Sequence, residues 1–354
     1  AWRILRGQLA ELASDQRNAA RHYAYARTMV PPGARQLCGP LLQRQAGALV
    51  AHGIRHDDEK ALIEAAQVYA EAGGFLSESL VPLEWAQAHV DLGHLMLVLG
   101  ERESRPERFL AAALHFKPAV DVFSRHHDLD RWAQAQIGLA MALKRSGEFQ
   151  GDVVMLGDAA FAFRAALGRL TKDRAPQEWA DAQLGLGETL VRIAEETGDT
   201  DALEMAVPAL KAALAQPREV APSLDVTSAQ AALGRAYASL GSQQQDDVML
   251  QDAISLLESA LASGARALST AEQAVIEQVR GTALWSLGEQ RASVRLLDDA
   301  MRAKLNAVEI YEQMGEFAVA GRIREDLDDL SNVIDSISNA SPRTTFANEA
   351  ARAG

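Results

Sequence analysis

The stretch APQEWADAQLGLGETL, residues Ala175–Leu190, recurs in altered form at two earlier places in the chain. VPLEWAQAHVDLGHLM covers Val81–Met96, and LDRWAQAQIGLAMAL covers Leu129–Leu143. The tryptophans of the three segments are 47 residues apart: Trp85, Trp132 and Trp179. A fixed period of this length is typical of a protein built from stacked structural repeats.

Three columns of small residues keep the same period. The first contains Gly93, Ala140, Gly187, Gly234 and Gly281. The second pairs alanines seven residues apart: Ala65 and Ala72, Ala112 and Ala119, Ala159 and Ala166, Ala206 and Ala213, Ala253 and Ala260, Ala300 and Ala307. The third, expected to end one helix of each unit, contains Gly53, Gly100, Gly147, Ala194, Gly241 and Gly288. These columns predict one repeat array rather than the two or three domains that a chain of 354 residues suggests.

Each unit is predicted to contain two helices. The first holds the tryptophan and the Leu-Gly pair, as in EWADAQLGLGETLVRIAEE, where Leu186, Leu190 and Ile193 recur at helical spacing. The second holds the alanine pair, as in DALEMAVPALKAALAQ, and its small side chains let a neighbouring helix come close. Neither helix can bury its apolar face alone, so the units are expected to stack into an all-α solenoid of antiparallel helix pairs.

The domain organisation follows from these limits. Residues 1–338 are predicted to form one solenoid, with an N-terminal helix at 1–30, about six repeats over 35–313 and a capping helix at 316–338. The residues of the capping helix expected to face inward are Phe317, Ile323, Leu327, Leu330 and Ile334. Residues 339–354 are predicted to be a disordered tail.

The two-helix unit resembles the tetratricopeptide repeat (TPR) family over residues 35–310. Leu233-Gly234 with Tyr237 matches the first-helix motif of the family, and Ala112-Phe116-Ala119 matches the second-helix motif. The unit is longer than the usual TPR unit of about 34 residues and is closer in length to HEAT or armadillo repeats. Surplus residues such as GEFQGDVVML are expected between the helices and between units, so the chain is most similar to a long-repeat bacterial variety. The resemblance implies a right-handed superhelix whose first helices line a concave, peptide-binding groove.

Composition excludes several classes of function. The net charge of -13 argues against a nucleic-acid binder, which needs a basic surface to neutralise phosphates. No apolar run reaches the roughly 18 residues of a membrane-spanning helix. Cys38 is the single cysteine, so no intramolecular disulfide is expected. With no visible signal peptide, the expected location is cytoplasmic.

No motif predicts catalysis, a cofactor or a metal ion. LGLGE, residues Leu184–Glu188, resembles a glycine-rich phosphate loop, but it lies inside a predicted helix whose backbone N–H groups are already bonded. His52 and His56, like His126 and His127, stand beside aspartates. Adjacent side chains rarely point at one metal, and both segments are predicted to be polar loops. We therefore expect a protein that is not an enzyme.

The first-helix positions one, four and five residues after the small residue are expected to face the groove. The candidate partner-binding residues are Arg44, His94, Met141, Lys144, Arg145, Glu188, Arg192, Arg235 and Trp285. Four of them, Lys144, Arg145, Arg192 and Arg235, would form a basic stripe that only Glu188 opposes, and such a stripe favours an acidic partner. The alternative is that these cations pair with neighbouring carboxylates. Trp285 breaks the register of the three earlier tryptophans, which are expected to pack between repeats.

These observations lead to one functional hypothesis and two alternatives. The hypothesis is a non-catalytic interaction module that binds a protein or peptide segment, expected to be acidic, in its concave groove. The first alternative is a regulatory or sensory region of a larger protein. The second is a scaffold that assembles with further copies of itself.

Overall fold

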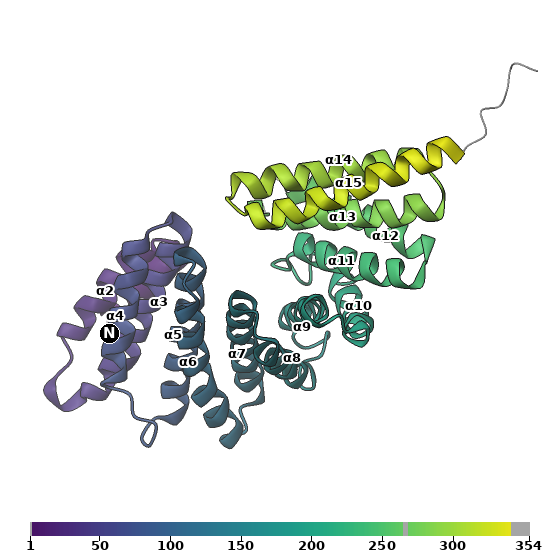
Figure 1. Cartoon of the computed structure of the whole chain (residues 1–354). Coiled ribbons are helices and arrows are strands. Elements are labelled where there is room, and N and C mark those ends of the chain that lie inside the picture. Colours follow the sequence, from purple (N-terminus) through teal and green to yellow (C-terminus); the bar gives the residue numbers. More distant parts are fainter. Residues whose placement is uncertain (1, 265–267, 341–354) are drawn as a thin grey trace, which may run out of the picture. The chain divides into compact units, whose positions relative to one another are not determined.

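The computed structural model describes residues 2–264 and 268–340 (Figure 1). In these ranges the chain forms fifteen α-helices and one short 3-10 helix, η1, and no strand. The predicted all-α class is therefore confirmed. From residue 341 onward, the predicted disordered tail lies outside the described residues.

The helices fall into two compact units, Ala1–Arg192 and Ile193–Gly354, and the limit between them lies within α9. The first unit contains α1 (Trp2–Leu12), α2 (Gln16–Thr28), η1 (Pro32–Leu37), α3 (Cys38–His56), α4 (Glu59–Gly73), α5 (Pro82–Glu103), α6 (Pro106–Arg125), α7 (Leu129–Gln150), α8 (Val153–Leu167) and most of α9 (Pro176–Thr197). The second contains α10 (Thr200–Leu214), α11 (Val226–Gln244), α12 (Asp247–Gly264), α13 (Thr270–Gln290), α14 (Val294–Gln313) and α15 (Phe317–Ala340). A single solenoid over residues 1–338 stays a prediction.

Within each unit, consecutive helices form antiparallel pairs that stack on one another (Figure 1). In the first unit the pairs are α3 with α4, α5 with α6 and α7 with α8. The first helix of a pair also contacts the first helix of the next pair, because α5 contacts both α3 and α7. In the second unit, α11 contacts α13 in the same way. This arrangement is that of an α-solenoid.

A very short turn joins the two helices of each pair. It begins with a residue of positive φ, such as Asp57 (53°), Gly151 (63°) or Gln245 (54°), which ends the first helix in the left-handed conformation. The next residue caps the second helix; the carboxylate of Asp152, for example, accepts from the backbone N–H groups of Val154 and Met155. The expectation of inserts between the helices of a pair is therefore wrong, since those residues extend the helices themselves.

The glycines expected to end the first helices lie inside them, about one turn before the end. A Cβ added at Gly100 would be 2.6 Å from the Phe109 ring, and one at Gly288 would be 2.7 Å from Leu297. The carbonyl of Gly100 accepts a hydrogen bond from the capping residue Ser104. These glycines recur because the two helices of a pair approach each other closely at this point.

A column of bulky second-helix residues packs between successive first helices. Its members are 47 residues apart from position 69 onward: Tyr69, Phe116, Phe163, Leu210, Leu257 and Lys304. The Phe116 ring is fully buried, and a Cβ added at Gly93 or Gly138 would lie within 3 Å of it. The small first-helix residues therefore provide the space that these rings fill.

The N-terminal region differs from its prediction. Residues 1–30 were expected to form one helix, but α1 and α2 are separated at Ser14, whose φ is 59°. Asp15 then caps α2 by accepting from the backbone N–H of Asn18 at 3.3 Å. This is the same turn that joins the helices of the later pairs, so α1 and α2 are also paired.

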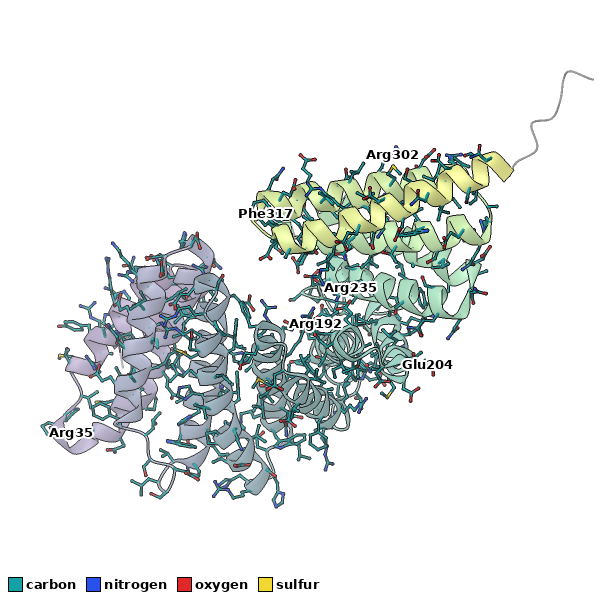
Figure 2. All side chains as sticks on the ribbon, in the orientation of Figure 1. Arg35, Arg192, Glu204, Arg235, Arg302 and Phe317 are labelled. Atoms are coloured by element: carbon teal, nitrogen blue, oxygen red, sulfur yellow. The ribbon has the colours of Figure 1, made fainter. Side chains whose placement is uncertain are left out.

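The last helix, α15, packs against α14 through most of the residues expected to face inward. Ile323 and Leu330 are buried in two separate core clusters. Leu327 packs on the cluster of Ile323, and Ile334 packs on the cluster of Leu330. The expectation for Phe317 is wrong, because its side chain is 67% exposed (Figure 2). Phe317 is the first residue of α15, and helical side chains tilt toward the N-terminus, so it extends beyond the packed part of the helix.

Candidate partner-binding groove

A cavity of about 340 Å³ opens between two successive first helices of the first unit. It is lined by Pro40, Gln43, Arg44 and Gly47 of α3, Tyr69 of α4, and Gln87 and Asp91 of α5. Arg44 is a predicted groove residue, and the other lining residues were not predicted. The cavity is shallow and open to solvent, so it suits a side chain of a surface-bound segment better than an enclosed small molecule.

The repeat period explains why these residues meet. Arg44 and Asp91 are 47 residues apart and hold the same position on α3 and α5, which are in contact. Tyr69 belongs to the bulky second-helix column that packs between first helices. The sequence alone contained this signal, because the frame already placed Arg44 and Asp91 in one column.

Asp91 is a charged residue in a column that holds glycine or alanine on the next three first helices, α7, α9 and α11. The same position is glycine on α7 and α9, where a Cβ added at Gly138 or Gly185 would lie 2.3 Å from a phenylalanine ring. On α5 it holds a half-buried carboxylate, and Gln87 Nε2 donates to Asp91 Oδ1 at 2.9 Å. Burial raises the pKa of Asp91 above its usual value, although the hydrogen bond from Gln87 lowers it.

Tyr69 forms the inner wall of the same cavity. Its side chain is buried, and burial together with the charge of Asp91 raises the pKa of the phenol. A Cβ added at Gly47 would be 3.8 Å from the Tyr69 hydroxyl, so this hydroxyl lies beside the space that the missing side chain of Gly47 leaves. Phe116 and Phe163 hold the equivalent positions, so this hydroxyl is particular to the first cavity.

His94 and Met141 continue the row that Gly47 begins. The three residues hold the same position on α3, α5 and α7. Met141 is 43% exposed, and the exposed His94 places its ring edge-on to Phe116, with 5.0 Å between centroids. The surrounding helices partly desolvate the imidazole and lower its pKa, which favours the neutral form of His94. Both predicted residues thus combine solvent access with packed surroundings.

Lys144 belongs to an ion-pair network between α7 and α9. Its ammonium pairs with Glu188 and lies 3.7 Å from Glu148, and its side chain is only 14% exposed. Burial alone would lower the pKa of Lys144, but the charges of both carboxylates and the hydrogen bond to Glu188 raise it above the usual lysine value. Lys144 and Glu188 are therefore brought together, and they neutralise each other.

Arg145 is paired with α5. Its guanidinium forms a two-point contact with Glu101, in which Nη2 lies 2.6 Å from Oε2, and Nη1 donates to Glu148 at 2.8 Å. The guanidinium also lies over the rings of Phe109 and Phe149. Forked pairing of this kind fixes both partners and satisfies the arginine's charge.

Arg192 and Arg235 do not stand as uncompensated charges either. In the second unit, Arg235 Nε donates to Glu195 at 2.8 Å and Nη2 contacts the other carboxylate oxygen. Arg192, at the end of the first unit, is half-buried and has interaction partners. The expectation that Glu188 alone opposes the basic stripe is therefore wrong, because Glu101, Glu148 and Glu195 compensate it from neighbouring positions.

Trp285 lies against the core of the second unit. It is half-buried, packs on the cluster around Leu284 and Leu330, and its ring centroid is 5.2 Å from the Lys304 ammonium. Lys304 is buried in the bulky second-helix column and pairs with Asp326 of α15 at 2.6 Å. Trp285 is thus surrounded by residues of its own unit. Trp85 and Trp132 pack against the core of the first unit, as predicted.

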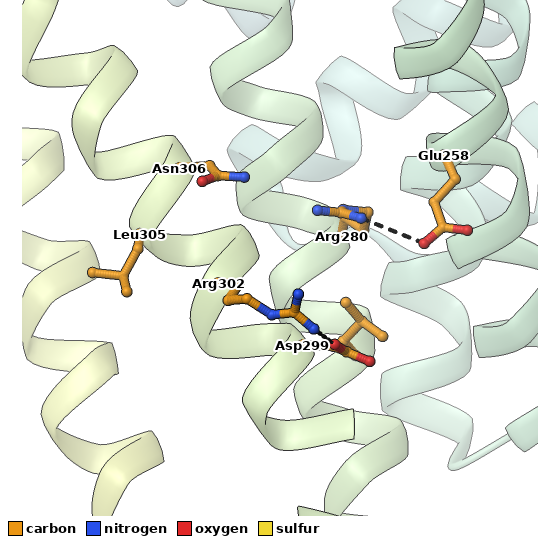
Figure 3. Close-up of a pocket in the computed structure, with 7 residues that line it drawn as sticks. Glu258, Arg280, Asp299, Arg302, Leu305 and Asn306 are labelled. Atoms are coloured by element: carbon orange, nitrogen blue, oxygen red, sulfur yellow. Dashed lines mark hydrogen bonds and ion pairs between the residues drawn. The ribbon is translucent and has the colours of Figure 1, made fainter. Parts of the chain in front are cut away.

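The second unit contains a cavity of about 370 Å³ (Figure 3). It is lined by Glu258, Arg280, Leu284, Asp299, Arg302, Leu305 and Asn306. Its charges are paired with one another: Arg280 lies 3.4 Å from Glu258 and 2.7 Å from Glu277, and Arg302 pairs with Asp299 (Figure 3). The cavity therefore offers no uncompensated charge to a ligand.

Two further searches cover the described part of the chain. Within residues 2–264 and 268–340, no group of three or more histidine, cysteine, aspartate or glutamate side chains could hold a metal ion. Over the same residues, no helix combines the length and apolar character needed to cross a membrane.

The sequence matches no protein-family model and no curated protein. Among solved structures, the chain is similar to a Rap protein complexed with competence and sporulation factor, at 13% identity, covering 94% of this chain and 85% of that one, with a TM-score of 0.44. A circular tandem repeat protein is 14% identical over 95% and 89%, with a TM-score of 0.24. A de novo designed helical repeat protein is 19% identical over 83% and 100%, with a TM-score of 0.16. All three TM-scores are low, so the solenoid assignment rests on the helices of this chain.

Proposed function

We propose that the chain is a non-catalytic, TPR-like interaction module that binds a segment of a protein partner on the first-helix face of its first unit. The observation that carries the proposal is the row formed by the cavity at Gly47, the exposed His94 and the exposed Met141. These positions repeat on α3, α5 and α7, so the row crosses three successive helices.

The dimensions of such a row suit an extended segment. Packed helices are about 8–10 Å apart, and an extended chain advances about 3.3 Å per residue. A segment lying across the first helices therefore places about every third side chain opposite the next position of the row. Met141 offers it an adaptable apolar contact, and the neutral imidazole of His94 offers hydrogen bonds.

The preference for an acidic partner was expected from a stripe of unpaired cations, and those cations have interaction partners in the structure. Lys144, Arg145 and Arg235 already share their charges with carboxylates of neighbouring helices. An acidic segment would have to displace those carboxylates and leave them unpaired, which costs free energy. We therefore retain a protein segment as the partner and drop the acidic preference. A cytoplasmic location stays a prediction.

A displayed library of random peptides, selected against the purified chain, tests the proposal. Selected peptides are measured by fluorescence anisotropy on wild type and on a His94→Glu, Met141→Glu variant. A Leu114→Glu, Phe161→Glu variant is the matched control, because both residues are 73% exposed on second helices. We expect the groove variant to lose at least about tenfold in affinity while the control does not. Peptides lost only by the control variant would show that second helices form the binding face.

One observation favours self-assembly as a second function. On α1, an exposed apolar row is formed by Trp2, Leu5, Leu9 and Leu12, which are 47–83% exposed. An uncovered face of this kind favours association with another protein surface. Light scattering across a concentration series tests whether that surface belongs to a second copy. A mass that stays monomeric in both wild type and a Leu9→Lys, Leu12→Lys variant contradicts self-assembly.

A further inference from the structure

The groove of the first unit contains a half-buried carboxylate, Asp91, that forms no ion pair within the described residues. We propose that the cavity at Asp91 receives a lysine or arginine side chain of the bound segment, with Asp91 as its counterion. This inference rests on the proposed function, and it specifies which chemistry the partner segment must carry.

The first argument is that Asp91 does not serve the packing of the repeats. Its column begins with Arg44 and continues after Asp91 with Gly138, Gly185, the buried Ala232 and the half-buried Val279. At the two glycines, close contact with a phenylalanine ring leaves room for little more. A half-buried carboxylate in such a column loses hydration, and no apolar contact of its own offsets that loss. A residue that breaks the local rule of a fold without stabilising it is expected at a functional site.

The second argument is that the fold supplies no cation to this carboxylate. Within the described residues, Asp91 forms no ion pair, and its one hydrogen bond comes from Gln87 to Oδ1. Arg44 lines the same cavity but also forms no ion pair with Asp91; its guanidinium carbon lies 6.0 Å from the centroid of the Tyr23 ring on α2. The second oxygen, Oδ2, is thus available to a ligand.

The third argument is that the other polar groups of the cavity can also accept hydrogen bonds. The Tyr69 hydroxyl lies beside the space at Gly47, and Tyr69 lines the cavity. Gln43 donates through Nε2 to the backbone carbonyl of Glu84 at 3.2 Å, so its Oε1 remains as an acceptor. An ammonium or guanidinium group carries three to five N–H donors and no acceptor, so it complements this set.

The fourth argument is the charge balance of the wider groove. The cations Lys144 and Arg145 are compensated by Glu188, Glu101 and Glu148, whereas Asp91 is not. The net charge of -13 favours a basic partner over an acidic one for the chain as a whole. We therefore assign the partner's charge at this cavity to Asp91, because the Arg44 guanidinium lies over the Tyr23 ring instead.

The test uses peptides from the displayed library whose binding depends on Met141. In each peptide, every arginine is replaced in turn by citrulline, its neutral isostere, and every lysine by norleucine. Binding is measured on wild type and on Asp91→Asn, which keeps the acceptor oxygen for Gln87 and removes only the charge. We expect one basic residue whose replacement weakens binding to wild type by at least about tenfold. Asp91→Asn should cause a similar loss, and the two changes together should cause little more.

The controls separate this inference from the proposed function. Arg44→Gln removes the cation of the same cavity and is expected to raise peptide affinity, because that cation repels the basic residue of the segment. The Leu114→Glu, Phe161→Glu variant, outside the cavity, is the control expected to leave affinity unchanged. All three variants must keep the helical signal and melting temperature of the wild type. Groove-dependent peptides that bind Asp91→Asn as tightly as wild type, or that weaken only with Arg44→Gln, overturn the inference and leave the proposed function standing. A library without groove-dependent peptides overturns both.

Discussion

The cavities of the two units have similar volumes, but their charged residues are paired in one and unpaired in the other. In the second unit, Arg280 and Arg302 are each held by carboxylates of the same or a neighbouring helix. In the first unit, Asp91 and Arg44 line one cavity without pairing. Paired charges hold helices in register, and an unpaired, half-desolvated carboxylate weakens the fold. The difference teaches that one repeat fold can pair the charges of one cavity and leave those of another unpaired.

The strongest test of this comparison places an aspartate at the position of the next repeat that is equivalent to Asp91. Gly138→Asp places a carboxylate where an added Cβ would lie 2.3 Å from the buried Phe116 ring. We expect a loss of at least about 3 kcal/mol in the free energy of unfolding, from overpacking and burial of a charge. Urea denaturation measures it. Gly157→Asp, at a helical position with open space around it, is the control and should cost much less.

The second comparison removes a cation from the paired cavity. Arg280→Ala leaves Glu277 and Glu258 without their partner, and the Glu277 side chain is only 13% exposed. We expect a loss of about 1–3 kcal/mol, because a partly buried carboxylate loses its ion pair. Arg302→Ala is the control, since that side chain is 76% exposed. Equal losses for both variants would mean that burial does not decide the strength of these pairs.

A third prediction concerns His89, which lies on α5 two residues before Asp91. Its Nδ1 is 3.2 Å from Nδ1 of His115, and its ring centroid is 4.1 Å from that of Trp85. Burial, and then the charge of His115, lower the pKa of His89 to about 4, although Glu78 acts in the other direction. In the unfolded chain its pKa is near 6.5, so the unfolded state binds more protons between these values.

Stability should therefore fall as the pH decreases from about 6.5 to about 4, and it should be fully present above pH 6.5. His89→Gln introduces the residue found at Gln136 and Gln183 in the same column. We expect this variant to reduce the acid loss by about 1–2 kcal/mol, measured by urea denaturation at several pH values. An unchanged pH profile would place the acid sensitivity elsewhere.

The fourth prediction is that Asp91→Asn does not destabilise the chain. The amide keeps the hydrogen bond from Gln87 and removes a desolvated charge, so we expect a gain of about 0.5–1 kcal/mol at pH 7. Because the folded pKa of Asp91 is raised, this gain should shrink as the pH falls toward the carboxylate's ordinary pKa. Thermal unfolding at pH 7 and at lower pH measures both. A clear loss of stability would assign Asp91 a structural role.

The smallest expected effect lies in the compensated part of the groove. A double-mutant cycle of Arg145→Ala and Glu101→Ala should give a coupling of about 0.5–1 kcal/mol, because both side chains are about one third to one half exposed. High salt should reduce it. A coupling of several kcal/mol would mean that the pair is far better shielded than its exposure indicates.

The sequence predicted the fold well because the same helix contacts recur in every repeat of the chain. The alanine pairs and the glycine columns mark places where neighbouring helices touch, and touching surfaces impose the same size limit in every unit. The 47-residue frame also carried the column that joins Arg44 and Asp91. The sequence misplaced the surplus residues, because a two-residue turn of a left-handed residue and a capping aspartate is too short to stand out from the helices around it.

By itself, then, the sequence determined the helix pairs, their stacking and which positions face one another, since these depend on side-chain size and period. Only the tertiary structure decided which charges are free. Glu101 and Glu148 lie outside the columns predicted for the groove, yet both neutralise Arg145. Glu101 does so from the neighbouring helix α5, and Glu148 from the next turn of the same helix. Asp91 is a single letter in the sequence, and its lack of a cation is a property of the space around it. Charge acts through distance and burial, which the order of residues does not specify.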